Sequence, residues 1–171
     1  QGCITDRRAG RLASNIAIPL VERMRTISVP DVEIEVKHVR DYRFAVVMRG
    51  EGLQADVDNT DPLRVGVPPL VAMARTPGAQ CTADHFNRWI DAARNVLADE
   101  PIANMLTLRG FSSDPRLPKY SDVYKLRAAC VAVYPMYKGV ARLVGMDVQS
   151  FLGEAPQDEF ASLAAAWNNY D

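Results

Sequence analysis

The sequence is short of the residue types that build metal sites and disulfide frameworks. Its 171 residues include three cysteines and two histidines. Cys3, Cys81 and Cys130 are far apart and lack a CxxC spacing, which favours unpaired thiols in a reducing cytoplasm over a disulfide or zinc site. His38 and His85 are too few for a zinc site built on histidine. We therefore expect no metal ion within this chain and a cytoplasmic location.

Long apolar runs and an excess of charge of one sign are also missing. No uninterrupted apolar run approaches the roughly 20 residues that span a bilayer. The chain has 20 Lys and Arg residues against 21 Asp and Glu residues, a net charge of −1. A molecule with so little net charge has no bulk attraction for nucleic acid or for an anionic membrane. We expect neither as a partner.

The common catalytic motifs are absent as well. The sequence contains no GxSxG nucleophile elbow, no phosphate-binding P-loop and no dinucleotide fingerprint. The carboxylates of residues 50–62 lack the spacing of an EF-hand calcium loop. From its residues alone, the chain is interpreted as an anion-binding module without a catalytic centre of its own.

What the sequence does contain predicts an α+β fold. Hydrophobic residues make up 48% and charged residues 24%, as in globular proteins. We expect one compact domain over 1–171, with helices packed on a mixed or antiparallel sheet. Periodicity predicts helices near 15–25, 82–97, 135–144 and 158–167, and strands near 32–36, 44–48, 104–108 and 128–133. The first two strands are expected to pair as an antiparallel hairpin, and 50–78 is rich in loops.

The densest group of charges lies near the N-terminus. Arg7, Arg8 and Arg11 place three guanidiniums within five residues, beside Asp6 and next to Gly10, which lets a ligand approach the backbone. Arginine suits bidentate binding of phosphate or carboxylate, so this segment is a candidate anion clamp. A solvated charge run at a domain edge is the alternative.

Three further polar segments are weaker candidates. Arg109 at the end of a predicted strand and Lys138 in a predicted helix each precede a glycine, and such isolated pairs are typical of surfaces. The segment 59–62, Asn-Thr-Asp-Pro, has the composition of an Asx-type turn, and a turn with no further role is the favoured interpretation.

Several segments, in the same order along the chain, resemble the insert of archaeal-type cofactor-independent phosphoglycerate mutases, which belong to the alkaline phosphatase superfamily. The similarity covers about residues 2–171. The segments that carry it are Ile4–Arg11, Arg43–Gly50, Asp61–Leu70, Ile102–Gly110 and Lys138–Asp147.

The resemblance implies a two-part metalloenzyme. An alkaline-phosphatase-like domain would carry two divalent metal ions (Mn, Mg, Zn or Co) and a serine that is transiently phosphorylated. The insert would close over the substrate. The resemblance implies that only the insert is present here, inactive by itself, and the absence of an initiator methionine agrees with that expectation. The parent would interconvert 2- and 3-phosphoglycerate in glycolysis and gluconeogenesis, with the absent domain as partner in cis.

The resemblance also implies a set of substrate-binding residues. Arg7, Arg8 and Arg11 would bind the phosphate or carboxylate, and Arg109 and Lys138 would close from the facing side. Asp6 would orient an arginine or accept a substrate hydroxyl, and Asp61 would fix the loop that places these groups. The complete set is Asp6, Arg7, Arg8, Arg11, Arg43, Asp61, Arg109 and Lys138.

Some departures from the family pattern motivate a second hypothesis. Tyr42 stands where the family usually has histidine, the segment before Ile102 is shorter, and residues 153–156 replace a small turn. The alternative is a non-catalytic or divergent paralogue that binds another phosphorylated or phosphonate metabolite. In either case the distant basic residues should share one concave surface, and the two ends of the chain should lie close together.

Overall fold

A computed structural model describes residues 2–171, and the chain packs as two compact units, Gln1–Ser113 and Asp114–Asp171. Helices and short sheets occur together, which confirms the α+β class. The expectation that residues 1–171 form one insert domain stays a prediction. Among the described residues, no helix is both long enough and apolar enough to cross a membrane.

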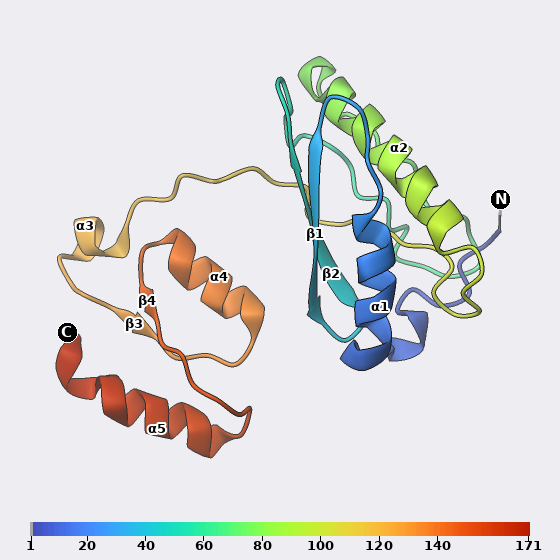
Figure 1. Ribbon diagram of the computed structural model, residues 1–171. Helices are drawn as coiled ribbons and strands as arrows, with labels where there is room; N and C mark the ends of the chain where they lie inside the picture. The colour runs from blue at the N-terminus through green and yellow to red at the C-terminus, as the bar shows by residue number, and fades with distance from the viewer. Residues whose placement is uncertain (1) are drawn as a thin grey trace. The chain divides into compact units, whose positions relative to one another are not determined.

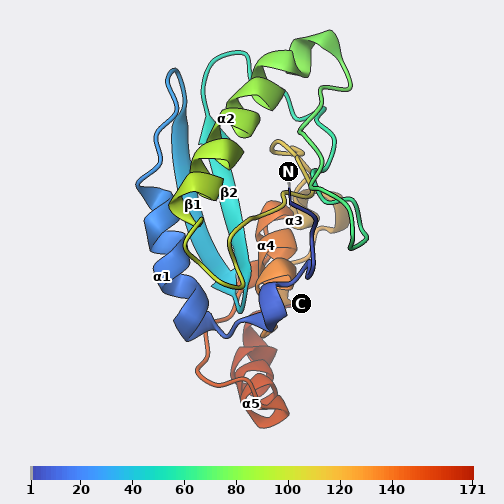
Figure 2. The ribbon, with the colours of Figure 1, turned by 90° about the vertical axis from the view of Figure 1, so that its right-hand side faces the viewer.

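The first unit is organised around an antiparallel hairpin. Strands β1 (Glu33–Arg40) and β2 (Arg43–Arg49) pair in register from Glu33 opposite Arg49, as the alternating pattern predicts. Helices α1 (Ser14–Arg25) and α2 (Gln80–Val96) cover one face of this hairpin (Figures 1 and 2). The predicted hairpin and both predicted helices of this unit are confirmed.

The main core lies between this hairpin and the two helices. Apolar side chains of α2 recur at helical spacing, so they line one face of the helix, and Trp89 at the centre is fully buried. Its ring packs near Phe44 of β2, with centroids 6.5 Å apart. The buried members of this core are Val21, Met24, Ile27, Val29, Val36, Trp89, Ile90, Ala93, Leu97 and Leu106.

The loop-rich segment 50–78 packs against α2 around a second, smaller core. Val57 is fully buried, bridges to Ala74 and lies in a cluster with Phe86 of α2. The Asn87 side chain donates to the Ala72 carbonyl and accepts from the Ala72 amide, each at 2.9 Å. The 3₁₀ turn η2 (Pro77–Ala79) then leads into α2. This long loop is thus held in place within the first unit.

The second unit contains short strands and three helices. Strands β3 (Ala129–Cys130) and β4 (Asp147–Val148) are parallel, and the helices are α3 (Tyr120–Tyr124), α4 (Pro135–Leu143) and α5 (Pro156–Ala166). The turn η3 (Trp167–Asn169) follows α5. The helices predicted near 135–144 and 158–167 are confirmed. Gly145, at φ 75°, follows the end of α4 in the left-handed region that glycine adopts readily.

Two strand predictions are wrong or only partly right. Residues 104–108 form no strand, because Leu108 makes its backbone hydrogen bonds with Thr60 in a loop instead of with a neighbouring strand. The strand predicted over 128–133 is reduced to the two residues of β3. A short apolar run does not show whether a partner strand exists. The presence or absence of such a partner determines whether each of these two segments forms a strand.

Candidate functional site

Asp61 is the centre of a cluster of charged groups from three distant parts of the first unit. Its carboxylate accepts two hydrogen bonds from Arg7, from Nε at 2.9 Å and from Nη2 at 2.7 Å. Nη1 of Arg109 lies 3.5 Å from the same carboxylate. We call Arg7, Asp61 and Arg109 the arginine cluster. Arg7 and Arg109 are 54 and 48 positions away from Asp61 in the sequence. The expected concave surface shared by the distant basic residues stays a prediction.

The electrostatics of the cluster favour the charged forms of Arg7 and Asp61. The hydrogen bond from Arg7 holds the pKa of Asp61 below its usual value, against the opposing effect of burial. The Leu63 amide, which donates to Asp61 at 2.9 Å, and the charge of Arg109 lower that pKa further. The same bond raises the pKa of Arg7. Two guanidiniums on one carboxylate leave one positive charge in excess.

The segment that carries Arg7 is shaped by Asp6. The Asp6 carboxylate accepts the backbone amides of Arg8 at 2.6 Å and of Gly10 at 2.9 Å, and these two bonds lower its pKa. They close the tight turn η1 (Ala9–Arg11), in which all three residues have positive φ, between 48° and 61°. Non-glycine residues at such φ are typical of constrained, functional segments. Asp6 thus holds the backbone of the turn, and whether it also orients an arginine or accepts a substrate hydroxyl stays a prediction.

The turn leaves two arginines exposed beside the cluster. Arg8 precedes η1 and Arg11 ends it, and both side chains are exposed. The backbone before the turn is attached to the Asp61 loop, because Ile4 exchanges hydrogen bonds of 2.9 Å with Gly66 and Val67. The N-terminal segment and the loop therefore form one support.

Arg109 is held by two residues that sequence reasoning assigned to a simple turn. The Leu108 amide donates to Oγ1 of Thr60 at 2.7 Å, and the Thr60 amide donates to the Leu108 carbonyl at 2.9 Å. On the other side of Arg109, the Gly110 amide donates to Oδ1 of Asn59 at 2.8 Å. The Asx turn itself is present, through Asp61 and Leu63. In the sequence, the only sign that residues 59–61 hold the Arg109 segment was their polar composition.

The remaining two predicted residues are not part of this cluster. Arg43 begins β2, where its guanidinium lies 3.4 Å from Asp41 and 4.7 Å from the centre of the Tyr42 ring. Lys138 belongs to α4 in the second unit and lies 5.4 Å from the centre of the Phe151 ring. Whether Arg43 and Lys138 bind substrate stays a prediction, as does the proximity of the chain ends, which belong to different units.

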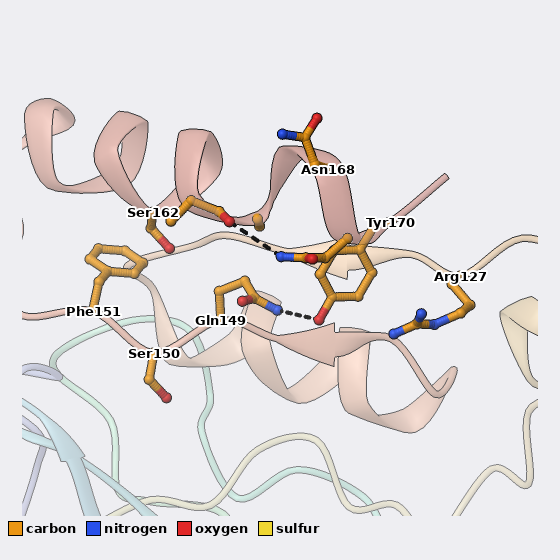
Figure 3. A pocket seen from close by; sticks show the side chains of 10 residues that line it. Arg127, Gln149, Ser150, Phe151, Ser162, Asn168 and Tyr170 are labelled. Atoms are coloured by element: carbon orange, nitrogen blue, oxygen red, sulfur yellow. Dashed lines mark hydrogen bonds between the residues drawn. The ribbon is translucent and has the colours of Figure 1, made fainter.

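A cavity of about 560 Å³ lies elsewhere, in the second unit (Figure 3). Arg127 is the charged residue among those that line it, and its guanidinium lies 5.3 Å from the centre of the Tyr170 ring. Gln149 donates to the Tyr170 hydroxyl at 2.9 Å. None of the predicted site residues lines the cavity. Its single arginine lies against an aromatic ring, so the cavity is a poorer anion site than the arginine cluster.

Replacing Thr60 by valine should destabilise the first unit while keeping the shape of the side chain. Thr60 is 1% exposed, and the loss of its hydroxyl leaves the Leu108 amide without its partner. Such a loss costs about 1–3 kcal/mol. Urea denaturation of T60V and of the conservative variant T60S measures the effect. Equal stability of T60V and the parent chain would show that the hydroxyl does not hold the Arg109 segment.

The sequence matches the family model described as "2,3-bisphosphoglycerate-independent phosphoglycerate mutase" over residues 1–103. That match covers more than half of the chain. The chain belongs to this family. It is 40% identical over 170 residues to a "Probable 2,3-bisphosphoglycerate-independent phosphoglycerate mutase" of Thermosipho africanus, covering 98% of this chain and 42% of the relative. A Thermus thermophilus relative of the same name is 40% identical over 181 residues, covering 100% and 43%.

Two solved structures share the fold of this chain. The cofactor-independent phosphoglycerate mutase of Thermoplasma acidophilum has a TM-score of 0.70 and 26% identity, with 100% of this chain and 50% of that chain covered. A Pyrococcus horikoshii protein, at 20% identity and a TM-score of 0.71, shares the fold over 98% of this chain and 43% of its own. The chain spans less than half of the length of the curated relatives that it matches.

Proposed function

We propose that this chain binds the substrate for a longer cofactor-independent phosphoglycerate mutase, which interconverts 2- and 3-phosphoglycerate. The observation that carries the proposal is the arginine cluster, in which one buried carboxylate positions two guanidiniums. Asp61 is 7% exposed, whereas the Arg109 side chain is 59% exposed. The buried carboxylate anchors the arrangement, and the exposed guanidinium is available to a ligand.

The chemistry of phosphoryl transfer suits such a site. This reaction depends mainly on positioning the phosphoryl group and neutralising its charge. Arg7 uses Nε and Nη2 for Asp61, whereas Nη1 of Arg109 lies 3.5 Å from that carboxylate. The exposed Arg109 guanidinium therefore keeps donors for a phosphate or carboxylate. Arg8 and Arg11 supply two further exposed guanidiniums on the adjoining turn. The names of the relatives make phosphoglycerate the substrate we propose.

The catalytic groups are proposed to belong to the remainder of the longer protein. Among residues 2–171, no three His, Cys, Asp or Glu side chains are grouped so that they could hold a metal ion. The described residues therefore do not fit the two divalent ions, which the resemblance places in the other domain. The serine nucleophile, the metal ions and the phosphatase-like domain in cis remain proposals, as do the cytoplasmic location and the inactivity of this chain alone.

Substitution of Arg109 by alanine tests the site directly. Titration of the 171-residue chain with 3-phosphoglycerate, followed by calorimetry, should show about a 10-fold loss of affinity in R109A. This corresponds to the loss of one charged hydrogen-bonding group. Arg88, an exposed arginine of α2, provides the matched control, because R88A removes the same charge outside the cluster.

Two results would contradict the proposal. One is equal affinity of R109A and R88A, which would show that only net charge matters. The other is no binding of phosphoglycerate by the unmodified chain together with saturable binding of a phosphonate or another phosphorylated metabolite. That second result would favour the divergent-paralogue hypothesis.

A further inference from the structure

Asn59 joins the Asp61 loop to the backbone beside Arg109 with only half of its side-chain amide. Its Oδ1 accepts the Gly110 amide at 2.8 Å, and both residues are exposed. Only the oxygen of an asparagine side chain accepts such a bond, so the bond fixes how the amide group is turned. Among residues 2–171, the Nδ2 group of Asn59 donates to no other residue. Its donors are therefore held in place and unused.

The backbone on both sides of Asn59 is fixed. The Asp58 amide donates to the Met73 carbonyl at 2.8 Å, and the Thr60 amide donates to the Leu108 carbonyl at 2.9 Å. Thr60 is 1% exposed, so the residue next to Asn59 is anchored in the interior. Ordering of loops and side chains is one of the costs of binding a ligand. A donor on this anchored segment avoids much of that cost.

The Arg109 side chain extends along the same short segment. Asn59 binds the amide of Gly110, the residue directly after Arg109, whereas the Arg109 guanidinium lies 3.5 Å from Asp61. Asp61 is two residues beyond Asn59, and two residues span at most about 7 Å of extended chain. The Arg109 side chain is 59% exposed. The unused donors of Asn59 and the exposed guanidinium are therefore neighbours.

Gly110 leaves room for a ligand beside these two groups. Its φ is 74°, in the left-handed region, and a methyl group added to its Cα would meet no heavy atom within 4 Å beyond its chain neighbours. Glycine with such a φ is common where the backbone approaches a ligand closely. A small anion bound to Arg109 thus meets no side chain at residue 110.

We infer that Asn59 is a further substrate-binding residue, whose Nδ2 donates to the anionic group that Arg109 binds. The inference rests on the proposed function, because it assigns a second donor to the same site. An arginine and a neutral amide together can bind two oxygens of one phosphate or carboxylate. Asn59 supplies its donor without adding charge to the two guanidiniums already grouped around Asp61. Oδ1 thus holds the backbone, and Nδ2 binds the ligand.

Two substitutions separate the donor from the acceptor of this side chain. N59D keeps an oxygen for the Gly110 amide but replaces the Nδ2 donor by an oxygen that repels anions, whereas N59A removes both groups and adds no charge. Titration of the 171-residue chain with 3-phosphoglycerate at neutral pH should show about a 10-fold loss of affinity in both variants. N95D adds the same charge at an exposed position of α2 and should bind normally. In urea, N59D should be as stable as the unmodified chain.

The side-chain amide of Asn59 also gives a direct readout of binding. In proton–nitrogen correlation spectra, the signals that disappear in N59D and in N95D assign the amide groups of Asn59 and Asn95. Addition of 3-phosphoglycerate to the unmodified chain should shift the Asn59 signals and leave those of Asn95 in place. Asn59 signals that stay unshifted when the site is saturated would overturn the inference.

The inference and the proposed function fail in different ways. Weak binding by N59A alone would show that Asn59 acts only by holding Gly110, and weak binding by N59D alone would show only that a negative charge is unfavourable there. Normal binding by both variants would show that Asn59 has no role. If R109A still binds more weakly than R88A in any of these cases, the proposed function stands without the inference. Absence of saturable phosphoglycerate binding by the unmodified chain would overturn both.

Discussion

Replacing Asp61 by alanine is expected to lower the free energy of unfolding of the first unit by about 3 kcal/mol, because it removes several charge-assisted hydrogen bonds at a buried position. The carboxylate accepts two bonds from Arg7 and one from the Leu63 amide, and it lies near Arg109. Affinity for phosphoglycerate should fall with stability, since the arginines lose their common anchor. Urea denaturation and calorimetric titration measure the two effects.

The same substitution should change the pH dependence of stability. The folded-state pKa of Asp61 is below its ordinary value of 3.8, so its stabilisation is fully present above that value. It is lost as the pH falls from about 4 through the lower, folded-state pKa. D61N keeps the shape of the side chain and should be free of this acid-dependent loss.

Asp58 provides the matched control for both measurements. It belongs to the same loop and also pairs with an arginine, Arg75, at 3.0 Å, but its side chain is 58% exposed. An exposed pair of this kind contributes about 0–1 kcal/mol. If D58A and D61A had equal effects on stability and on binding, the central role of Asp61 would be refuted.

Replacing Trp89 by alanine should have an even larger effect, a loss of about 3–5 kcal/mol, as for other large-to-small core substitutions. Trp89 is fully buried between α2 and the hairpin, where it packs near Phe44. Because domains are stable by only about 5–15 kcal/mol, the first unit should be close to unfolding at room temperature. Urea denaturation followed by circular dichroism measures the change.

The matched control is the other tryptophan. Trp167 is 71% exposed in this chain, so W167A should change stability by less than about 0.5 kcal/mol. Comparable losses in W89A and W167A would mean that the hairpin and two helices do not form the principal core. The pair of variants also tests whether the two units unfold separately, since each contains one tryptophan.

Much of the fold could be predicted because its signals are local. The hairpin follows from apolar and polar residues alternating over 32–36, and α2 from apolar residues at helical spacing. The strand predicted over 104–108 was wrong for the opposite reason. Its apolar residues satisfy the pattern, but Leu108 bonds to Thr60, which is 48 residues away.

From the sequence, the candidate site was predicted as a set of residues, without the contacts that they make with one another. The cluster around Arg7 and the importance of Asp61 came from sequence motifs and family resemblance, and the bidentate bond between them joins positions 54 apart. The supporting roles of Asn59 and Thr60 were missed, because a polar turn has the same composition whether or not it holds a distant segment.

The sequence by itself determined the α+β class, the near-neutral charge, the helical faces of the first unit and the arginine-rich character of the site. These depend on composition and on periods of two or 3.6 residues, which act over short stretches of chain. Only the tertiary structure decided that Arg7 and Arg109 meet at Asp61, that Asp6 closes a backbone turn, and that the chain divides near Ser113. Contacts between distant segments depend on how loops close and which polar groups they bury together, and no local pattern encodes that.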